Sequence, residues 1–291
     1  MKKKVVIECV GTKCNQDCVF CTVKNYREQG FAEKNFKRIS KELKVMYEHG
    51  FRMVELIGGE LTIRKDFLDI IREAKVIGFE DIGLSTNMKR FSDSTFTATA
   101  VKAGVNFVYM SLHGYDAKSH ESATQARGSF DNAIEAIKNI VEYKAIYKSI
   151  NCVIHSDNVE HLKDVCELIL SLGVRDILFI IMDPLNVEKE KFNIVPRYDL
   201  IATNMREVLS VYGKKMNIRI QNLPYCLLEE GIDNFSKYDS DDSTVILLPN
   251  GKSIGLNEDS FDRKIKFQEC LACKYNSQCN GYWRNYFKNR V

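Results

Sequence analysis

Short runs of β-type residues alternate with helical hydrophobic patterns along the first two-thirds of the chain. Lys4 to Val10 predicts a first strand, and apolar positions in residues 36–46 then follow helical spacing. Further strands are predicted at 53–57, 81–85, 105–112, 149–155 and 174–182, with helices at 66–77, 95–103, 129–147, 160–172 and 198–211. Strand–helix units repeated at this interval imply a parallel sheet with right-handed crossovers. The pattern therefore predicts an α/β protein.

Six such units suit a partial (β/α)6 TIM-type barrel, while a flavodoxin-like doubly wound sheet stays open as an alternative. In either architecture the functional residues lie beyond the carboxyl ends of the strands. Four candidate segments follow predicted strands: the cysteine triplet at 14–21, Gly58-Gly59-Glu60, Ser85-Thr86-Asn87 and Ser111-Leu112-His113. Their shared position predicts one common site.

The strand–helix rhythm changes after about residue 215. Residues 217–220 suggest one more strand, 233–243 an acidic loop, and 245–256 a hairpin around Asn250-Gly251. We therefore expect a core barrel over residues 1–215 and a small α+β, cluster-binding extension over residues 216–291.

Composition narrows the class of protein. The 291 residues carry a formal net charge of +3, which argues against a dedicated nucleic-acid binder. No stretch is long and apolar enough to cross a bilayer, and residues 1–7 are too short for a signal peptide. A cytoplasmic protein that does not associate with membranes is expected.

The ten cysteines are unevenly distributed. Clustered cysteines in a chain with no sign of export favour metal or redox chemistry over disulfides. They fall into a first group of Cys14, Cys18 and Cys21, a second group of Cys270, Cys273 and Cys279, a separate Cys226, and the isolated Cys9, Cys152 and Cys166. We expect the last three to be buried as small hydrophobic residues.

The first group offers three thiolates where a [4Fe–4S] cube normally has four. No further cysteine stands nearby, so one iron would keep an open position for a ligand, as catalytic metal sites do. A zinc site completed by a distant residue is the alternative.

Cys14-x3-Cys18-x2-Cys21, with Phe20 before the last cysteine, resembles the hallmark motif of the radical S-adenosylmethionine (SAM) superfamily. The resemblance implies that the open iron binds the amino and carboxylate groups of SAM. One electron from the cluster then cleaves SAM to methionine and a 5′-deoxyadenosyl radical, which abstracts hydrogen from a substrate. In such enzymes the cofactor supplies the chemistry and the protein positions it.

Gly58-Gly59-Glu60 strengthens the resemblance because it follows the second predicted strand. Two glycines let backbone approach a ligand closely, and a glutamate accepts hydrogen bonds from an ammonium group. The resemblance implies that this motif holds the methionyl amine of SAM. Family members usually continue with proline, whereas this chain has Leu61.

Less specific expectations concern polar residues at the ends of the following predicted strands. The resemblance places Asn87 and Ser111 near the ribose and carboxylate of SAM, although Asn87 could simply end a strand. His113 is a candidate acid or base facing the substrate, since imidazole titrates near neutral pH. Four further residues are expected to line the site: Asn151, His155, Met182 and Asp183.

Cys270-x2-Cys273-x5-Cys279 resembles the start of the "SPASM" extension of radical SAM maturases. The next cysteine of that pattern is replaced by Trp283, which indicates the shortened "twitch" form with one auxiliary cluster. Cys226 is the best fourth ligand of this second [4Fe–4S] cluster. A zinc site remains the alternative, because paired cysteines two residues apart are equally typical of zinc ribbons.

These features predict a radical SAM enzyme acting on a peptide or a small molecule by oxidation, epimerisation or crosslinking. Flavodoxin or ferredoxin is expected as the external reductant. The cysteine loop begins at residue 14, so we expect no fused leader-binding domain, and a separate protein could deliver a peptide. The rival hypothesis is a non-catalytic iron–sulfur or zinc protein that senses redox state or binds RNA.

Overall fold

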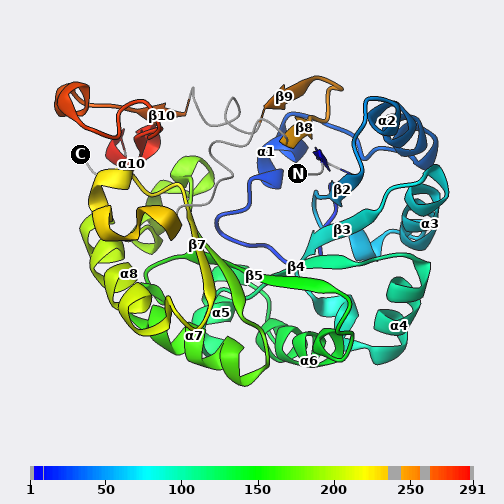
Figure 1. Cartoon of the computed structure of the whole chain (residues 1–291), viewed down its shortest axis with the longest axis horizontal. Coiled ribbons are helices and arrows are strands. Elements are labelled where there is room, and N and C mark those ends of the chain that lie inside the picture. Colours follow the sequence, from blue (N-terminus) through cyan, green and yellow to red (C-terminus); the bar gives the residue numbers. More distant parts are fainter. Residues whose placement is uncertain (1–2, 9, 235–243, 256–262, 289–291) are drawn as a thin grey trace.

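The computed structural model describes residues 3–8, 10–234, 244–255 and 263–288 (Figure 1). Within these ranges nine strands form one sheet in the order β7-β6-β5-β4-β3-β2-β1-β8-β9. The strands are β1 (Lys4–Ile7), β2 (Met53–Leu56), β3 (Asp81–Thr86), β4 (Phe107–Ser111), β5 (Tyr147–Ile154), β6 (Asp176–Ile181), β7 (Asn217–Gln221), β8 (Thr244–Leu247) and β9 (Ser253–Gly255). Neighbouring strands are parallel throughout, except that β9 returns antiparallel to β8.

The longer helices cover the outer side of the curved sheet (Figure 1). The helices are α1 (Val23–Glu28), α2 (Phe36–Glu48), α3 (Phe67–Ile77), α4 (Ser94–Ala103), α5 (Ala117–Thr124), α6 (Ser129–Val141), α7 (Leu162–Ser171), α8 (Tyr198–Tyr212) and α10 (Arg284–Lys288). Strands β1 to β7 are adjacent in chain order, so each crossover proceeds in the same direction. A doubly wound sheet reverses its strand order. The predicted partial barrel is therefore confirmed, and the flavodoxin-like alternative is wrong.

The two faces of each strand have different environments. On β5, Ile150, Cys152 and Ile154 are fully buried in the hydrophobic core. The alternate residues Asn151 and Val153 line a cavity on the inner side of the sheet. The prediction that Cys152 is a buried small residue is confirmed, as it is for Cys166 of α7, while Cys9 lies outside the described residues.

The hairpin predicted at 245–256 is present as β8 and β9, with Asn250-Gly251 in its turn. Its strand β8 pairs in parallel with β1, so the hairpin extends the main sheet. Most of the predicted acidic loop, residues 235–243, lies outside the described ranges. The boundary at residue 215 stays a prediction.

One helix prediction needs correction, and other helices were missed. The helix expected over 129–147 ends at Val141, because Tyr147 already pairs with Phe107 as the first residue of β5. Helices α1 and α5 were not predicted. The sequence of α5 is largely polar, and the helix begins where the Asp116 carboxylate accepts a hydrogen bond from the backbone N–H of Ser119 at 2.8 Å.

The C-terminal segment is attached to the barrel by Trp283. In this segment β10 (Lys264–Ile265) pairs antiparallel with β11 (Tyr282–Trp283). The buried indole of Trp283 donates its Nε1–H to the carbonyl of Ile181 at 3.2 Å, and its backbone N–H bonds the hydroxyl of Tyr198 at 3.2 Å. Trp283, at the position where the expected pattern would have a further cysteine, thus docks this segment onto the end of β6. None of the helices in the described ranges has the length and apolarity to span a membrane.

Candidate functional site

The first cysteine group lies on the loop between β1 and α1. The backbone N–H groups of Asp17 and Val19 bond the carbonyls of Thr124 and Ala123 at 3.1 and 3.0 Å. These two bonds hold the middle of the cysteine loop against the end of α5. The loop is therefore anchored by the chain itself on both sides of Cys18.

The three cysteines of this loop are half-buried and lie close to one another. Burial raises the pKa of Cys18 to about 12, and the neighbouring Cys21 and Cys14 contribute by electrostatic repulsion. Burial also raises the pKa of Cys14, with smaller contributions from Glu60 and Cys21. Mutually repelling thiolates at close range are a donor set that metal coordination stabilises.

The chemistry of this donor set fits a cube better than a single ion. Across the described ranges, no three histidine, cysteine or carboxylate side chains are grouped so that they could hold one metal ion. The thiolates of a [4Fe–4S] cluster bind different irons, so they need not converge on one point. Cys14, Cys18 and Cys21 all line one cavity, and they are the residues that would hold such a cluster.

The two glycines after β2 are required by the cysteine loop. The backbone N–H of Gly59 bonds the Gly11 carbonyl at 2.6 Å, and that of Glu60 bonds the Lys13 carbonyl at 2.8 Å. A Cβ atom added to Gly58 or Gly59 would collide with the backbone of Gly11 or Lys13, respectively. The structure shows that these glycines make room for the cysteine loop, and the expectation that they make room for a ligand stays a prediction.

The carboxylate of Glu60 is buried and bound by the chain's own donors. It accepts hydrogen bonds from the hydroxyls of Thr62 and Thr86 at 2.6 and 2.9 Å and from the backbone N–H of Asn87 at 2.8 Å. Burial raises its pKa, and these hydrogen bonds partly offset that effect. Glu60 thereby joins the ends of β2 and β3, and its predicted contact with an ammonium group stays a prediction.

Asn87 connects the end of β3 with the cysteine loop. Its Nδ2 donates to the side-chain oxygen of Asn15 at 2.6 Å and lies 3.7 Å from the sulfur of Cys14. The sequence prediction placed Asn87 near the site but gave no role to Asn15. Asn15 could have been noticed, since it is a short polar residue directly after a predicted ligand.

Ser111 and Asn151 are register partners on β4 and β5, and both line the cavity. The side-chain oxygen of Asn151 is buried and has no hydrogen-bond partner in the described part of the chain. A buried acceptor of this kind is costly unless a ligand satisfies it. These two residues are therefore suited to receive a ligand with hydrogen-bond donors.

His113 is buried and neutral. Burial holds the pKa of its ring well below the usual value, and His120 and His155 contribute repulsion. Its Nδ1 accepts a hydrogen bond from the backbone N–H of Val153 at 3.2 Å, so the proton resides on Nε2. The ring lies edge-on to that of Phe20, with centroids 4.9 Å apart. His113 therefore offers the cavity a hydrogen-bond donor, and its predicted acid–base role remains untested.

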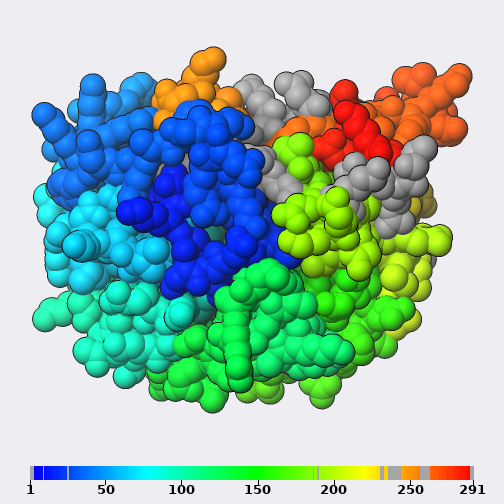
Figure 2. Space-filling model, turned by 180° about the vertical axis from the view of Figure 1, so that it is seen from behind, coloured from blue at the N-terminus to red at the C-terminus, as the bar shows by residue number. Residues whose placement is uncertain are grey.

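These side chains surround a chamber of about 470 Å³ on the inner side of the barrel. From behind, the blue N-terminal segment surrounds a recess in the molecular surface (Figure 2). All the residues predicted for the first site line this chamber, together with Asn151, Met182 and Asp183, whereas His155 is not among them. His155 is buried behind it, with a ring nitrogen 2.6 Å from the carbonyl oxygen of His113. Residues that the sequence prediction missed include Glu55, Tyr109, Gln221, Asn222 and Arg263.

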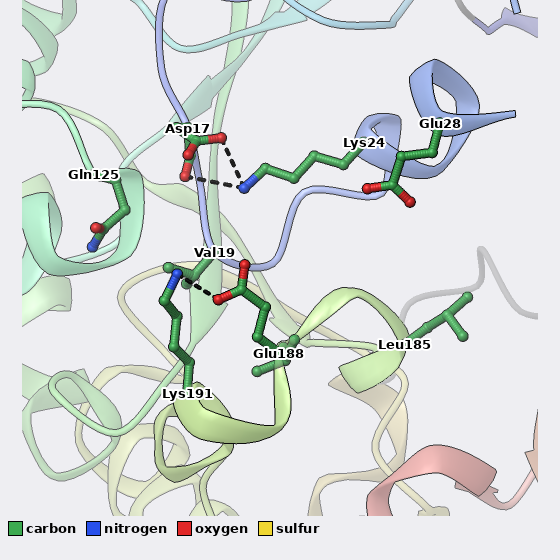
Figure 3. A pocket seen from close by; sticks show the side chains of 9 residues that line it. Asp17, Val19, Lys24, Glu28, Gln125, Leu185, Glu188 and Lys191 are labelled. Atoms are coloured by element: carbon green, nitrogen blue, oxygen red, sulfur yellow. Dashed lines mark hydrogen bonds and ion pairs between the residues drawn. The ribbon is translucent and has the colours of Figure 1, made fainter. Parts of the chain in front are cut away.

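A smaller hollow of about 270 Å³ lies on the other side of the cysteine loop. Figure 3 shows two ion pairs facing it, Lys24 with Asp17 at 2.8 Å and Lys191 with Glu188 at 2.7 Å. Residues 17 and 19 line this hollow, whereas residues 16, 18 and 20 line the chamber. The extended cysteine loop thus forms the wall between the two spaces.

The second cysteine group is gathered in the extension. Partial desolvation of the thiol raises the pKa of Cys226 even though the residue as a whole is exposed, and the three other cysteines add electrostatic repulsion, with Cys279 contributing most. The hydroxyl of Tyr282 bonds Cys226, and the backbone N–H of Gly281 lies 3.3 Å from the sulfur of Cys279. The four predicted auxiliary ligands are therefore close enough to interact. Four thiolates, with the N–H of Gly281 and the hydroxyl of Tyr282 as hydrogen-bond donors to sulfur, fit an iron–sulfur cluster.

A model of the radical SAM superfamily matches residues 9–169, more than half of the chain, and the protein belongs to this superfamily. It is 28% identical over 206 residues to a probable GTP 3′,8-cyclase of Sulfurisphaera tokodaii, covering 71% of this chain. The match spans 63% of that relative, less than two-thirds of its length.

Solved structures share the fold. A structure of anSMEcpe with bound AdoMet superposes with a TM-score of 0.69 at 15% identity, covering 99% of this chain and 94% of the other. Streptococcus suis SuiB bound to S-adenosylmethionine gives a TM-score of 0.67 at 15% identity, covering 97% and 73%. The predicted superfamily is thus confirmed, and the family implies SAM and a [4Fe–4S] cluster as cofactors.

Proposed function

We propose that this radical SAM enzyme cleaves SAM at a cluster held by Cys14, Cys18 and Cys21 and uses the resulting radical to abstract hydrogen from a substrate. One observation carries the proposal: the three cysteines, Gly58 to Glu60 and Asn87 line the same chamber. Among the described lining residues there is no fourth cysteine, which leaves a coordination position for SAM. When bound, the cluster and SAM supply a one-electron cleavage that yields methionine and a 5′-deoxyadenosyl radical.

The chain's own residues position the cysteine loop and the bound reactants. Glu60 and Asn87 fix the cysteine loop relative to β2 and β3. Ser111 and Asn151 present hydrogen-bonding groups from β4 and β5, a placement that suits the hydroxyls of a ribose. His113 donates a hydrogen bond from Nε2 to a bound group rather than removing a proton from it.

We propose a second [4Fe–4S] cluster on Cys226, Cys270, Cys273 and Cys279. Four thiolates would saturate this cube, which favours electron transfer over direct binding of substrate. The gathered position of these cysteines and the hydroxyl of Tyr282 support the proposal.

The substrate is a peptide or a small molecule. A relative is named as a probable GTP 3′,8-cyclase, while a structural neighbour, SuiB, was solved with its precursor peptide SuiA. We propose a low-potential carrier such as flavodoxin or ferredoxin as the electron donor, and a separate recognition protein if the substrate is a peptide.

Anaerobic reconstitution tests the proposal directly. The reduced protein with SAM should produce 5′-deoxyadenosine, and joint replacement of Cys14, Cys18 and Cys21 by alanine should abolish that product. The triple variant should retain the iron and sulfide of one cube, and Cys166→Ala in α7 serves as the cysteine control. Intact cubes that yield no deoxyadenosine would favour the rival hypothesis of a redox-sensing protein.

A further inference from the structure

Four aliphatic side chains form one part of the chamber wall. They come from three strands: Val6 from β1, Leu178 and Ile180 from β6, and Ile246 from β8. Val6, Leu178 and Ile246 are only 5, 6 and 5% exposed, yet none of the three belongs to the hydrophobic core. They are therefore buried on the inner side of the barrel and not between the sheet and its helices.

The strand register groups these side chains into two pairs. Val6 and Ile246 are direct partners across β1 and β8, so they lie side by side on one face of the sheet. Leu178 and Ile180 are two residues apart on β6 and share its inner face. The sheet curves round the chamber (Figure 1), and the two pairs belong to strands near its opposite ends. The pairs therefore face the chamber from two sides.

The middle strands present polar side chains to the same chamber. Ser85, Ser111 and Asn151 line it from β3, β4 and β5. Asn151 is the register partner of Leu178, so the aliphatic part of the wall begins directly beside a residue that we assign to the ribose of SAM. The proposed function uses the polar part for the cluster and SAM and gives no role to the aliphatic part.

The charged side chains of the chamber wall are bonded to other groups of the chain. Among the described lining residues, the carboxylates and basic groups are those of Glu55, Glu60, Asp183 and Arg263. Glu55 is paired with buried Lys4 at 2.5 Å, and Asp183 is paired with Arg263 at 2.7 Å. Glu60 accepts the hydrogen bonds described above. A ligand that enters beside SAM therefore meets aliphatic side chains and charges that already have partners.

We propose that Val6, Leu178, Ile180 and Ile246 hold a neutral aliphatic group of the substrate next to SAM. The inference rests on the proposed function, in which the chamber holds the substrate beside SAM. Aliphatic residues on two sides supply van der Waals contacts to such a group. A polar group in the same place would lose its hydrogen bonds to water without replacement. The substrate class is thus one with a branched hydrocarbon group, such as a leucine side chain.

Capped amino acids test this preference. Leucine with acetyl and amide caps is the probe, equally capped asparagine has nearly the same shape but is polar, and capped aspartate is charged. Each is titrated into the oxidised holoenzyme saturated with SAM. The readout is the fluorescence of Trp283, which lines the chamber and is the single tryptophan of the chain. The leucine probe should bind about ten- to a hundredfold more tightly than the asparagine probe, because a buried polar group without a partner is costly.

A further probe distinguishes the two sources of an aliphatic group. 3-Methylbutanamide carries the branched group of leucine without a peptide backbone. Tighter binding of capped leucine would support the proposal with a peptide as the substrate. Equal or tighter binding of 3-methylbutanamide would support it with a small molecule.

Variants change the size and the polarity of the wall separately. Leu178→Ala widens the aliphatic part, so it should weaken the binding of capped leucine and strengthen that of capped phenylalanine. Ile246→Thr adds a hydroxyl beside Val6 and keeps the β-branched shape that suits a strand, so it should reduce the preference for leucine over asparagine. A purely structural role of Leu178 predicts that every probe binds more weakly. Val76→Thr, at a side chain of α3 that is 82% exposed, should change no affinity.

Several results would overturn the proposal: no binding of the leucine probe, equal affinity for leucine and asparagine, tighter binding of aspartate, or an unchanged size preference in Leu178→Ala. Weaker SAM binding in Leu178→Ala would also overturn it, since the aliphatic residues would then contact SAM. These measurements need no radical chemistry. Deoxyadenosine formation with equal probe affinities would count against this inference alone. A failure to form deoxyadenosine with the leucine preference intact would count against the proposed function alone.

Discussion

The cysteine loop near the start of the chain and the cysteine-bearing extension at its end differ in how much protein holds each in place. The loop is bonded to the end of α5 and to the backbone after β2, and its cysteines line an internal chamber. In the extension, Cys226 is exposed and Leu271 is 77% exposed. The first site is largely preorganised by the barrel, whereas the second depends on its docking residue and on whatever the cysteines bind.

The largest expected effect concerns the cysteine loop, which the barrel holds in place. Gly59→Ala drives a Cβ into the backbone of Lys13, so it should displace the cysteine loop and lower deoxyadenosine formation at least a hundredfold. Iron analysis should show the radical cluster lost and the auxiliary cluster retained. Gly30→Ala is the comparison: its added Cβ meets no atom within 4 Å, so it introduces only the strain of a left-handed backbone outside the site and should leave deoxyadenosine formation unchanged. Unchanged activity in Gly59→Ala would show that the loop adapts.

The next effect concerns the docking of the extension. Trp283→Ala removes a buried aromatic side chain and its bond to Ile181, at a cost of about 3–5 kcal/mol in the free energy of unfolding. Limited proteolysis should cut the extension first, while the iron bound by the cysteine loop stays. Phe267→Ala, at a side chain that is 40% exposed, should change much less. Simultaneous loss of both clusters would mean that the two regions fold as one unit.

Lowering the pH should destabilise the barrel, because three of its histidines are buried. Burial lowers the pKa of His113 and His155, and it lowers that of His120 from 6.5 to about 4. As the pH falls, the unfolded chain binds protons on these histidines at a higher pH than the folded protein does. The free energy of unfolding is therefore largest above about pH 6.5 and decreases as the pH drops toward 4. His120 alone accounts for about 3 kcal/mol across that window.

His120→Asn keeps a side-chain acceptor for the N–H of His113 and removes the titration. Its unfolding free energy should therefore depend less on pH between 6.5 and 4, as measured by urea denaturation. His49→Asn, which replaces an exposed ring directly after α2, is the matched histidine control. An identical slope in His120→Asn would contradict the assignment.

The smallest effect concerns the proposed auxiliary cluster. Tyr282→Phe removes the hydroxyl that bonds Cys226, and the reduction potential should fall by about 20–60 mV, because a hydrogen bond to the ligand stabilises the reduced state. Redox titration followed by electron paramagnetic resonance would measure this, with the radical cluster as internal control. A shift in the radical cluster instead would place Tyr282 in a different role.

The sequence predicted the elements that depend on local pattern and missed those that depend on distant partners. The strands and helices from β2 to α8, with the exception of α5, were found because their apolar residues repeat with a clear period. The parallel pairing of β8 with β1 joins residues more than two hundred positions apart, and no local pattern records it. Helix α5 was missed because its buried side includes Ser119, His120 and Thr124, so it lacks the apolar stripe by which a helix is recognised from sequence.

The same distinction holds for the candidate site. Cysteine spacing and the Gly-Gly-Glu segment identified the loop and its neighbour because the motifs are contiguous. Arg263 was missed because its partners, Asp183 and Trp283, lie 80 and 20 positions away and no motif contains it. The sequence could not show that Gly59 is needed to avoid a collision with the backbone of Lys13, since that backbone belongs to another segment.

The alternation along β5 has an evolutionary consequence. Ile150, Cys152 and Ile154 pack into the core and secure the strand, whereas Asn151 and Val153 face the chamber. Selection can therefore replace chamber residues one at a time while the neighbouring core positions preserve the fold. A barrel built in this way can acquire a new substrate without first sacrificing its stability.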